Sequence, residues 1–132
     1  MMKFSRQSRL LKPAEFKSVF QQAIRSGDDC FRIMARANGI QHHRLGMAVA
    51  KKACSRAVDR NRIKRVIREN FRTRIIGLKT VNTLDFVVLP NAIATKRSNK
   101  ELNESLSTHW QRLIRKAGQR NNPDRPDQKR TD

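Results

Sequence analysis

The stretch that most constrains the fold is residues 57–72, which read AVDRNRIKRVIRENFR. On a helical wheel its large apolar side chains fall on one arc, formed by Ile63, Val66, Ile67 and Phe71. An amphipathic helix of this kind is stable only when the apolar arc is covered, and we expect a sheet to cover it. The same sixteen residues include six Arg or Lys and only two acids, so the exposed side is a dense cluster of like charges.

The charged side of this helix is too one-sided for an ordinary solvated face. The arc opposite the apolar residues contains Asn61, Arg62, Lys64, Arg65, Arg68 and Arg72, with Glu69 as its one acid. A solvated face needs about as many acids as cations, because each i,i+4 ion pair contributes only about 0.2–0.5 kcal/mol and one acid cannot offset five cations. Arg also suits bidentate phosphate contacts. The pattern therefore favours a nucleic-acid surface over a solvated face.

The overall charge points to the same class of partner. The chain has 132 residues, which suits one domain, and its formal net charge is +19, which favours a polyanion. Apolar runs fall short of the roughly 18 residues of a membrane span, and MMKFSRQSRLLKP does not resemble a signal peptide. We therefore expect a cytoplasmic protein with no membrane partner. Cys30 and Cys54 are expected to be reduced thiols.

The N-terminal half contains one helix pattern and two strand patterns. Pro13 and Gly27 bracket a helix over 13–25, in which Phe16, Val19, Phe20 and Ile24 recur at helical spacing. Residues 30–37 alternate as a strand. One face contains Phe31, Ile33, Ala35 and Ala37, and the other contains Cys30, Arg32, Met34 and Arg36. After a turn in NGIQHH, residues 44–50 form the second strand, with Leu45, Met47 and Val49 on one face.

The C-terminal half adds a strand and a helix. The segment 84–89 is nearly all apolar, as in a strand covered on both faces, and Pro90 is expected to end it. Ser98 and Glu101 form a capping box for a last helix that ends at Gly118. Its apolar stripe contains Leu102, Leu106, His109, Trp110, Leu113 and Ala117. The expected fold class is α+β, a small two-layer sandwich over 1–118 with one further short strand possible. The Pro-containing tail, 119–132, is expected to be disordered.

Structured RNA suits such a domain better than DNA does. A basic helix can enter the DNA major groove, but here its apolar arc is committed to a sheet, and no helix precedes it at helix-turn-helix spacing. No protein active site or metal site is evident, since His42 and His43 lack flanking acids or cysteines and His109 lies on an apolar stripe.

Several segments resemble one family, the bacterial ribonuclease P protein component. Its signature is an Arg-Asn-Arg helix, which AVDRNRIKRVIRENFR is similar to. The segments RLLKPAEFKSVF (9–20), RLGMAVAKK (44–52) and DFVVL (85–89) resemble further family segments, in family order over 9–118.

The resemblance implies an auxiliary subunit of an endoribonuclease whose chemistry belongs to a large catalytic RNA. That RNA uses Mg²⁺ to hydrolyse one phosphodiester bond and release the mature tRNA 5′ end. The protein, which holds no cofactor of its own, binds the ribonuclease P catalytic RNA and the single-stranded 5′ leader of precursor tRNA. The family fold contains a mixed sheet with a left-handed βαβ crossover, an exception to the right-handed rule.

The resemblance also assigns residues by position. Those expected to bind the catalytic RNA are Arg60, Asn61, Arg62, Lys64, Arg65, Arg68 and Arg72. Those expected to bind the leader, in a cleft on the sheet, are Arg9, Phe16, Phe20, Arg32, Met34, Arg36, Lys51 and Lys52. An aromatic stripe is usually core, but stacking of single-stranded bases needs aromatic rings beside cations, so we expect at least one of the two Phe rings to contact the leader.

Two departures from the family pattern fall near these contacts. Met34 stands where several members have an aromatic residue, and Pro90-Asn91 stands where a basic residue often follows the strand. Two other classes remain open. One is a structural RNA-binding protein such as a small ribosomal protein, and the other is a protein-only nuclease or DNA-binding regulator.

Overall fold

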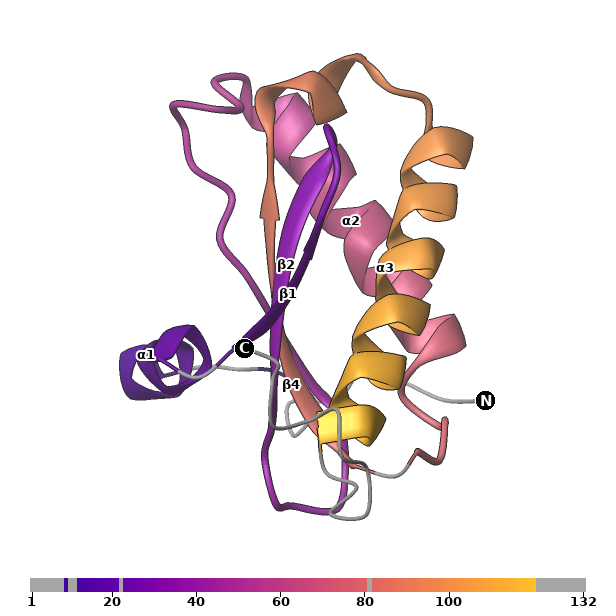
Figure 1. The fold of residues 1–132 in the computed structure, drawn as a ribbon. Helices are drawn as coiled ribbons and strands as arrows, with labels where there is room; N and C mark the ends of the chain where they lie inside the picture. The colour runs from indigo at the N-terminus through magenta and orange to yellow at the C-terminus, as the bar shows by residue number, and fades with distance from the viewer. Residues whose placement is uncertain (1–8, 10–11, 22, 81, 121–132) are drawn as a thin grey trace.

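The computed structural model describes residues 9, 12–21, 23–80 and 82–120, which form three helices, one 3₁₀ helix and four strands (Figure 1). In chain order these are α1 (Pro13–Gln21), β1 (Ile24–Gly27), β2 (Phe31–Ala37), β3 (Arg44–Met47), α2 (Ala57–Arg74), β4 (Leu84–Pro90), η2 (Ala92–Lys96) and α3 (Asn99–Arg120). Within the described residues, none of the helices is both long enough and apolar enough to cross a lipid bilayer.

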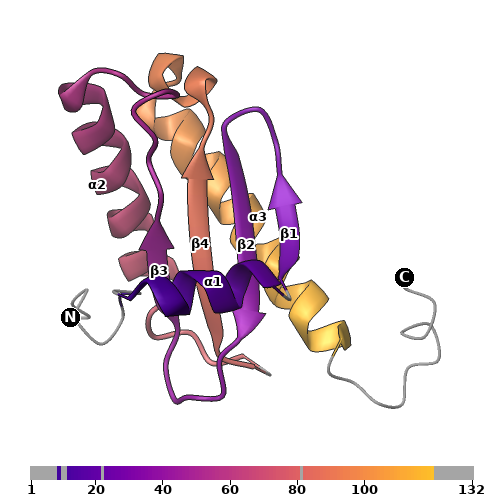
Figure 2. The same cartoon turned by 90° about the vertical axis from the view of Figure 1, so that its left-hand side faces the viewer.

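The four strands form one mixed sheet in the order β1-β2-β4-β3. β2 pairs antiparallel with both β1 and β4, whereas β3 and β4 are parallel neighbours joined through α2. In Figure 2 both parallel strands point upward, α2 lies behind the sheet, and β4 lies to the right of β3. The crossover is therefore left-handed, as the family resemblance implies and against the usual rule. The α+β class and the mixed sheet are confirmed.

The main core lies between the sheet and the helix pair α2 and α3. All four apolar residues predicted for the arc of α2 are buried, and Ile67 is completely inaccessible. The predicted stripe of α3 is buried as well. Edge-to-face contacts join Phe71, Phe86 and Trp110 with ring centroids 5.1–6.0 Å apart, so one aromatic from each of α2, β4 and α3 meets at the centre.

Helix α1 crosses the other face of the sheet (Figure 2). There Val19 packs with Met34 and Val87 in a second, smaller apolar cluster. The strand β4 is thus covered on both faces, which explains its continuous apolar sequence. The sheet and the helices α2 and α3 form the two expected layers, and α1 packs on the opposite face of the sheet.

Two predicted boundaries near the first helix are wrong. The helix predicted over 13–25 ends at Gln21, and Ile24 and Gly27 belong to β1, the short further strand. Ile24 matched the helical period, but it pairs with Ala35 of β2 and packs against the main core instead. Cys30 was expected on the cationic face of the next strand. It precedes β2 and is buried in the main core, since the chain turns at Asp28, whose side chain accepts hydrogen bonds from the amides of Cys30 and Phe31.

The remaining differences lie at element ends. β3 ends at Met47, short of the predicted residue 50, and β4 keeps Pro90 as its last paired residue. The predicted capping box of α3 is confirmed, because the Ser98 amide donates to Glu101 Oε1 at 3.0 Å and the Glu101 amide donates to Ser98 Oγ at 3.1 Å. Gly118 does not end α3, which continues to Arg120, because this glycine does not adopt the left-handed conformation of a C-cap. Residues 121–132 of the predicted tail lie outside the described residues.

Candidate nucleic-acid interface

The outer side of α2 has the composition that the sequence predicted. Asn61 and Arg65 are exposed, and Lys64, Arg68 and Arg72 are half-buried. Within the described residues, no hydrogen bond or ion pair joins the side chain of Lys64, Arg65 or Arg68 to any other group. These three cations are held on a rigid helix whose opposite arc is packed into the core, and they remain available to an external anion. We call the five residues Asn61, Lys64, Arg65, Arg68 and Arg72 the α2 surface.

The one acid on this side of the helix already has a partner. Glu69 accepts a hydrogen bond from Arg72 Nε at 2.7 Å, and its carboxylate also pairs with Nη2 of the same guanidinium. Such an i,i+3 pair on a helix surface contributes only a few tenths of a kcal/mol. Glu69 therefore neutralises Arg72 and leaves the charge of its neighbours uncompensated.

Arg60 and Arg62 differ from Lys64, Arg65 and Arg68 because their guanidinium groups donate hydrogen bonds to other segments of the chain. Arg60 Nη1 donates to the carbonyl oxygens of Cys54 and Ser55 at 2.9 and 2.8 Å. Arg62 Nη1 donates to Asn99 Oδ1 at 2.7 Å, and Nη2 donates to the carbonyls of Ala94 and Thr95 at 3.4 and 3.3 Å. The first joins α2 to the preceding loop, and the second joins it to η2 and the start of α3.

The second candidate surface is the face of the sheet that α1 partly covers, which we call the outer sheet face. Strand alternation and register place ten positions on it: Arg25, Gly27, Arg32, Met34, Arg36, Arg44, Gly46, Asp85, Val87 and Leu89. Met34 and Val87 lie at its centre on β2 and β4, Arg32 and Arg36 lie on either side of Met34 along β2, and Arg25 and Arg44 lie on the edge strands. This is a mixed apolar and cationic surface.

The predicted leader-binding residues gather around this face with different exposures. Phe20 of α1 is 39% exposed, whereas Phe16 is half-buried against the cluster of Val19, Met34 and Val87. Met34 is only 7% exposed, so a ligand on this face would reach little more than its edge.

The cations predicted for the leader also lie around the outer sheet face. Arg32 is exposed on β2, and Lys51 and Lys52 are exposed in the loop after β3. Arg36 Nη1 donates to the Ser18 carbonyl at 3.1 Å, which joins β2 to α1. Arg9 is exposed, and its backbone forms an isolated parallel bridge with Leu45 of β3.

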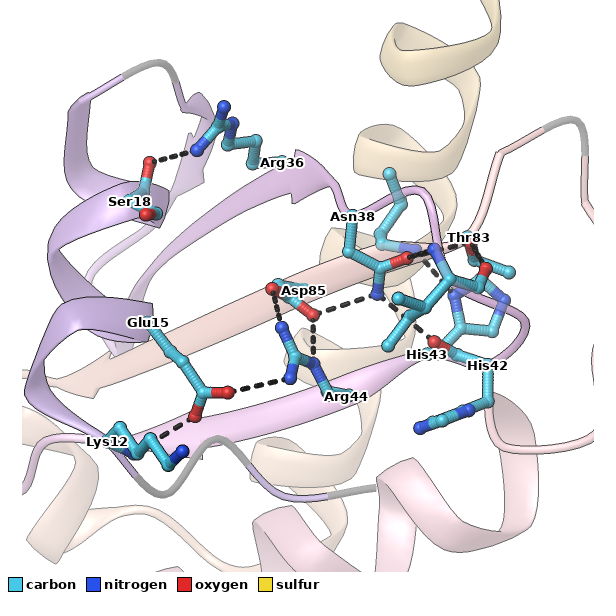
Figure 3. A network of polar contacts seen from close by, with 12 residues as sticks. Lys12, Glu15, Ser18, Arg36, Asn38, His42, His43, Arg44, Thr83 and Asp85 are labelled. Atoms are coloured by element: carbon cyan, nitrogen blue, oxygen red, sulfur yellow. Dashed lines mark hydrogen bonds and ion pairs between the residues drawn. The ribbon is translucent and has the colours of Figure 1, made fainter. Parts of the chain in front are cut away.

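Sequence reasoning missed the ionic network that fixes α1 on the sheet (Figure 3). Arg44 Nε and Nη2 donate to the two carboxylate oxygens of Asp85 at 2.8 and 2.7 Å, and Arg44 Nη1 donates to Glu15 Oε2 at 2.8 Å. Asn38 Nδ2 also donates to Asp85 Oδ1 at 2.8 Å. The hydrogen bonds with Asp85 raise the pKa of the Arg44 guanidinium, so Arg44 is a permanent cation. The network joins α1, β3 and β4, and thereby positions both Phe rings.

The two buried histidines contact other elements of the fold. Burial lowers the pKa of His43, whose Nδ1 accepts from the Leu84 amide at 3.0 Å while Nε2 lies 3.1 Å from the Leu78 carbonyl. His109 Nδ1 lies 2.6 Å from Ser26 Oγ, and its Nε2 lies 3.1 Å from Asp28 Oδ2. Both rings therefore join elements of the fold.

One small group of potential metal ligands, Asp28, Asp29 and Cys30, has ligand atoms within 4.8 Å of one another. Asp28 accepts hydrogen bonds from two backbone amides and from Ser105 Oγ, and Asp29 pairs with Arg97 at 2.7 Å. Burial, with the nearby Asp28 charge, raises the pKa of the Cys30 thiol to about 11, so it is not a thiolate at neutral pH. These contacts account for the group without a metal.

Comparisons with known proteins identify the family of the chain. The family model described as Ribonuclease P matches residues 4–114, which include α2 and the whole sheet. The chain belongs to the ribonuclease P protein family. It is 46% identical over 112 residues to the ribonuclease P protein component of Aliivibrio salmonicida, covering 85% of this chain and 93% of that protein. It is 42% identical over 120 residues to the corresponding component of Methylococcus capsulatus, covering 91% of each.

Solved structures of ribonuclease P proteins have the same fold. The Staphylococcus aureus protein aligns with a TM-score of 0.72 at 28% identity, covering 81% of this chain and 97% of that one. The Thermotoga maritima protein aligns with a TM-score of 0.66 at 27% identity, covering 81% and 96%. Ribonuclease P is an endoribonuclease of tRNA processing, so this family member is part of such an enzyme and has an RNA partner.

Proposed function

We propose that the chain binds the catalytic RNA of ribonuclease P through the α2 surface and the 5′ leader of precursor tRNA through the outer sheet face. The observation that carries the first part is that the side chains of Lys64, Arg65 and Arg68, held on α2, have no partner among the residues that the structure describes. Their mutual repulsion opposes folding of the free protein and is relieved when phosphates lie against them. Arg62 extends this surface toward α3.

The composition of the outer sheet face supports the leader as its ligand. Single-stranded nucleic acid is bound by aromatic rings that stack on bases and by cations that follow the backbone. Phe20 offers an accessible ring near the end of α1, and the ring of Phe16 is half-buried. Arg32, Lys51 and Lys52 are cations suited to the leader phosphates, with Arg9 and Arg36 nearby.

In this proposal the protein binds the catalytic RNA and orients the 5′ leader of the precursor, and the RNA subunit performs the hydrolysis with Mg²⁺. The histidines and acids described above are engaged in structural contacts, which suits a subunit without an active site of its own. Protein cations near the RNA phosphates lower the concentration of Mg²⁺ that the RNA needs to fold and act. Because the substrate is a tRNA precursor, we place the complex in the cytoplasm.

Reconstitution tests this proposal directly. The purified chain, a bacterial ribonuclease P RNA and a precursor tRNA are combined at low Mg²⁺, and 5′ leader release is measured with each component omitted in turn. We expect release only when the RNA is present, and faster release when the protein is added. Release by the protein alone would indicate a protein active site. Binding to the RNA without faster release would favour a purely structural RNA-binding protein.

A further inference from the structure

The loop that carries Lys51 and Lys52 is closed and anchored. The Ala50 carbonyl accepts hydrogen bonds from the amides of Ala53 and Cys54 at 3.2 and 3.0 Å, which closes a turn around the two lysines. The Cys54 side chain is 1% exposed and belongs to the main core. One end of the turn is therefore fixed by packing, while both lysine side chains stay in solvent.

Arg60 adds a second anchor to the same turn. Arg56, the N-cap residue before α2, is extended and makes no side-chain capping hydrogen bond among the described residues. One turn further along the helix, Arg60 Nη1 donates to the carbonyl oxygens of Cys54 and Ser55 at 2.9 and 2.8 Å. The guanidinium thus bonds the first turn of α2 to the backbone that leaves the lysine turn.

We propose that Arg60 is a positioning residue that fixes the Lys51–Lys52 turn relative to α2, and so sets the distance between the leader-binding and catalytic-RNA-binding surfaces. This inference rests on the proposed function. It gives Arg60 a role different from that of Arg65, which is exposed on the same helix and has no partner among the described residues. Arg65 binds an RNA phosphate directly, whereas Arg60 holds the Lys51–Lys52 turn in the position from which the lysines contact the leader.

Because the two roles differ, replacing each arginine by glutamine should change a different binding property. Arg65→Gln removes a phosphate contact, so the log–log salt slope of catalytic-RNA binding becomes shallower by about 0.7–0.9. Arg60→Gln leaves that slope unchanged within error. It reduces the preference for precursor over mature tRNA instead, by roughly threefold to tenfold, the size expected when two solvent-exposed charge contacts are misplaced.

A double-mutant cycle in the reconstituted holoenzyme tests whether Arg60 acts through the turn. Precursor and mature tRNA binding are measured for wild type, R60Q, K51Q/K52Q and the combined variant. We expect R60Q to lower the precursor preference in the wild-type background and to add no further loss in the K51Q/K52Q background. A slope change equal to that of R65Q, an unchanged precursor preference, or fully additive losses would each overturn the inference.

The same set of variants separates this inference from the proposed function. If K51Q/K52Q itself leaves the precursor preference unchanged, the assignment of the leader surface fails, whatever R60Q does. Hydrogen exchange at the amides of Ala53 and Cys54 gives a readout independent of RNA. We expect faster exchange in R60Q but not in R65Q, and equal protection in the two variants would overturn the anchoring role.

Discussion

The ionic network under α1 makes a quantitative prediction for Asp85→Asn. Asp85 and Arg44 form two charge-assisted hydrogen bonds, and their side chains are only 9% and 20% exposed. Removing one partner of a fully buried pair costs about 3–5 kcal/mol, because the other charge is left without compensation. Arg44 keeps its bond to Glu15 and some contact with water, so we expect the free energy of unfolding to fall by about 2–3 kcal/mol.

Urea unfolding followed by circular dichroism measures this loss, provided that the m-value is unchanged. Asp29→Asn is the matched control, because it removes the same charge from an ion pair with Arg97 in which Asp29 is mostly exposed. We expect the control to be indistinguishable from wild type. If Asp85→Asn also lowers the free energy of unfolding by less than about 1 kcal/mol, the network does not hold α1 in place.

Three further predictions concern the core, the outer sheet face and a buried thiol. Ile67→Ala should lower the free energy of unfolding by roughly 2–5 kcal/mol, because it opens a cavity at a fully buried position. Phe16→Ala should weaken precursor tRNA binding, by roughly 1–3 kcal/mol per stacked base, and spare mature tRNA, which has no leader. The pKa of Cys30 is raised from 9.0 to about 11, chiefly by burial, so unfolding releases its proton between these values and stability should fall as pH rises through that window.

Each of these has a clear contrary result. A loss below half a kcal/mol for Ile67→Ala in urea melts would mean that the helix is rotated from the arrangement described. Equal weakening of both tRNAs by Phe16→Ala would make that ring a core residue only. Cys30→Ala should reduce the fall in stability between pH 9 and pH 11, and an unchanged slope would show that the Cys30 thiol is not its source.

The elements with long, regular patterns were predictable from sequence. The apolar arc of α2 and the stripe of α3 are set by helical periodicity, and the capping box marks the start of α3 by local hydrogen bonding alone. Strand β4 was identifiable because cover on both faces leaves a continuous apolar run. The cationic composition of the α2 surface follows directly once the apolar arc is known.

The differences arise where distant residues decide the structure. Ile24 fits a helical period, but pairing with β2 outweighs that local preference. Arg44 and Asp85 are 41 residues apart, so no local pattern joins them, although an acid in an otherwise apolar strand was a usable signal for a buried partner. The internal contacts of Arg60 and Arg62 were equally invisible, since a helical wheel shows direction but not the loop that lies against it.

We propose that the cations of the α2 surface contact RNA phosphates, and the salt dependence of binding to the catalytic RNA decides whether they do. We expect Arg65→Gln with Arg68→Gln to flatten the log–log slope by roughly 1.5 without changing the urea unfolding curve. The control, Arg112→Gln with Arg115→Gln, removes the same charge from exposed positions on α3 and should leave the slope close to wild type. If neither double variant changes the slope, the α2 surface is a solvated face, and if both flatten it equally, the effect comes from net charge and not from α2. Either result would contradict the proposed contact.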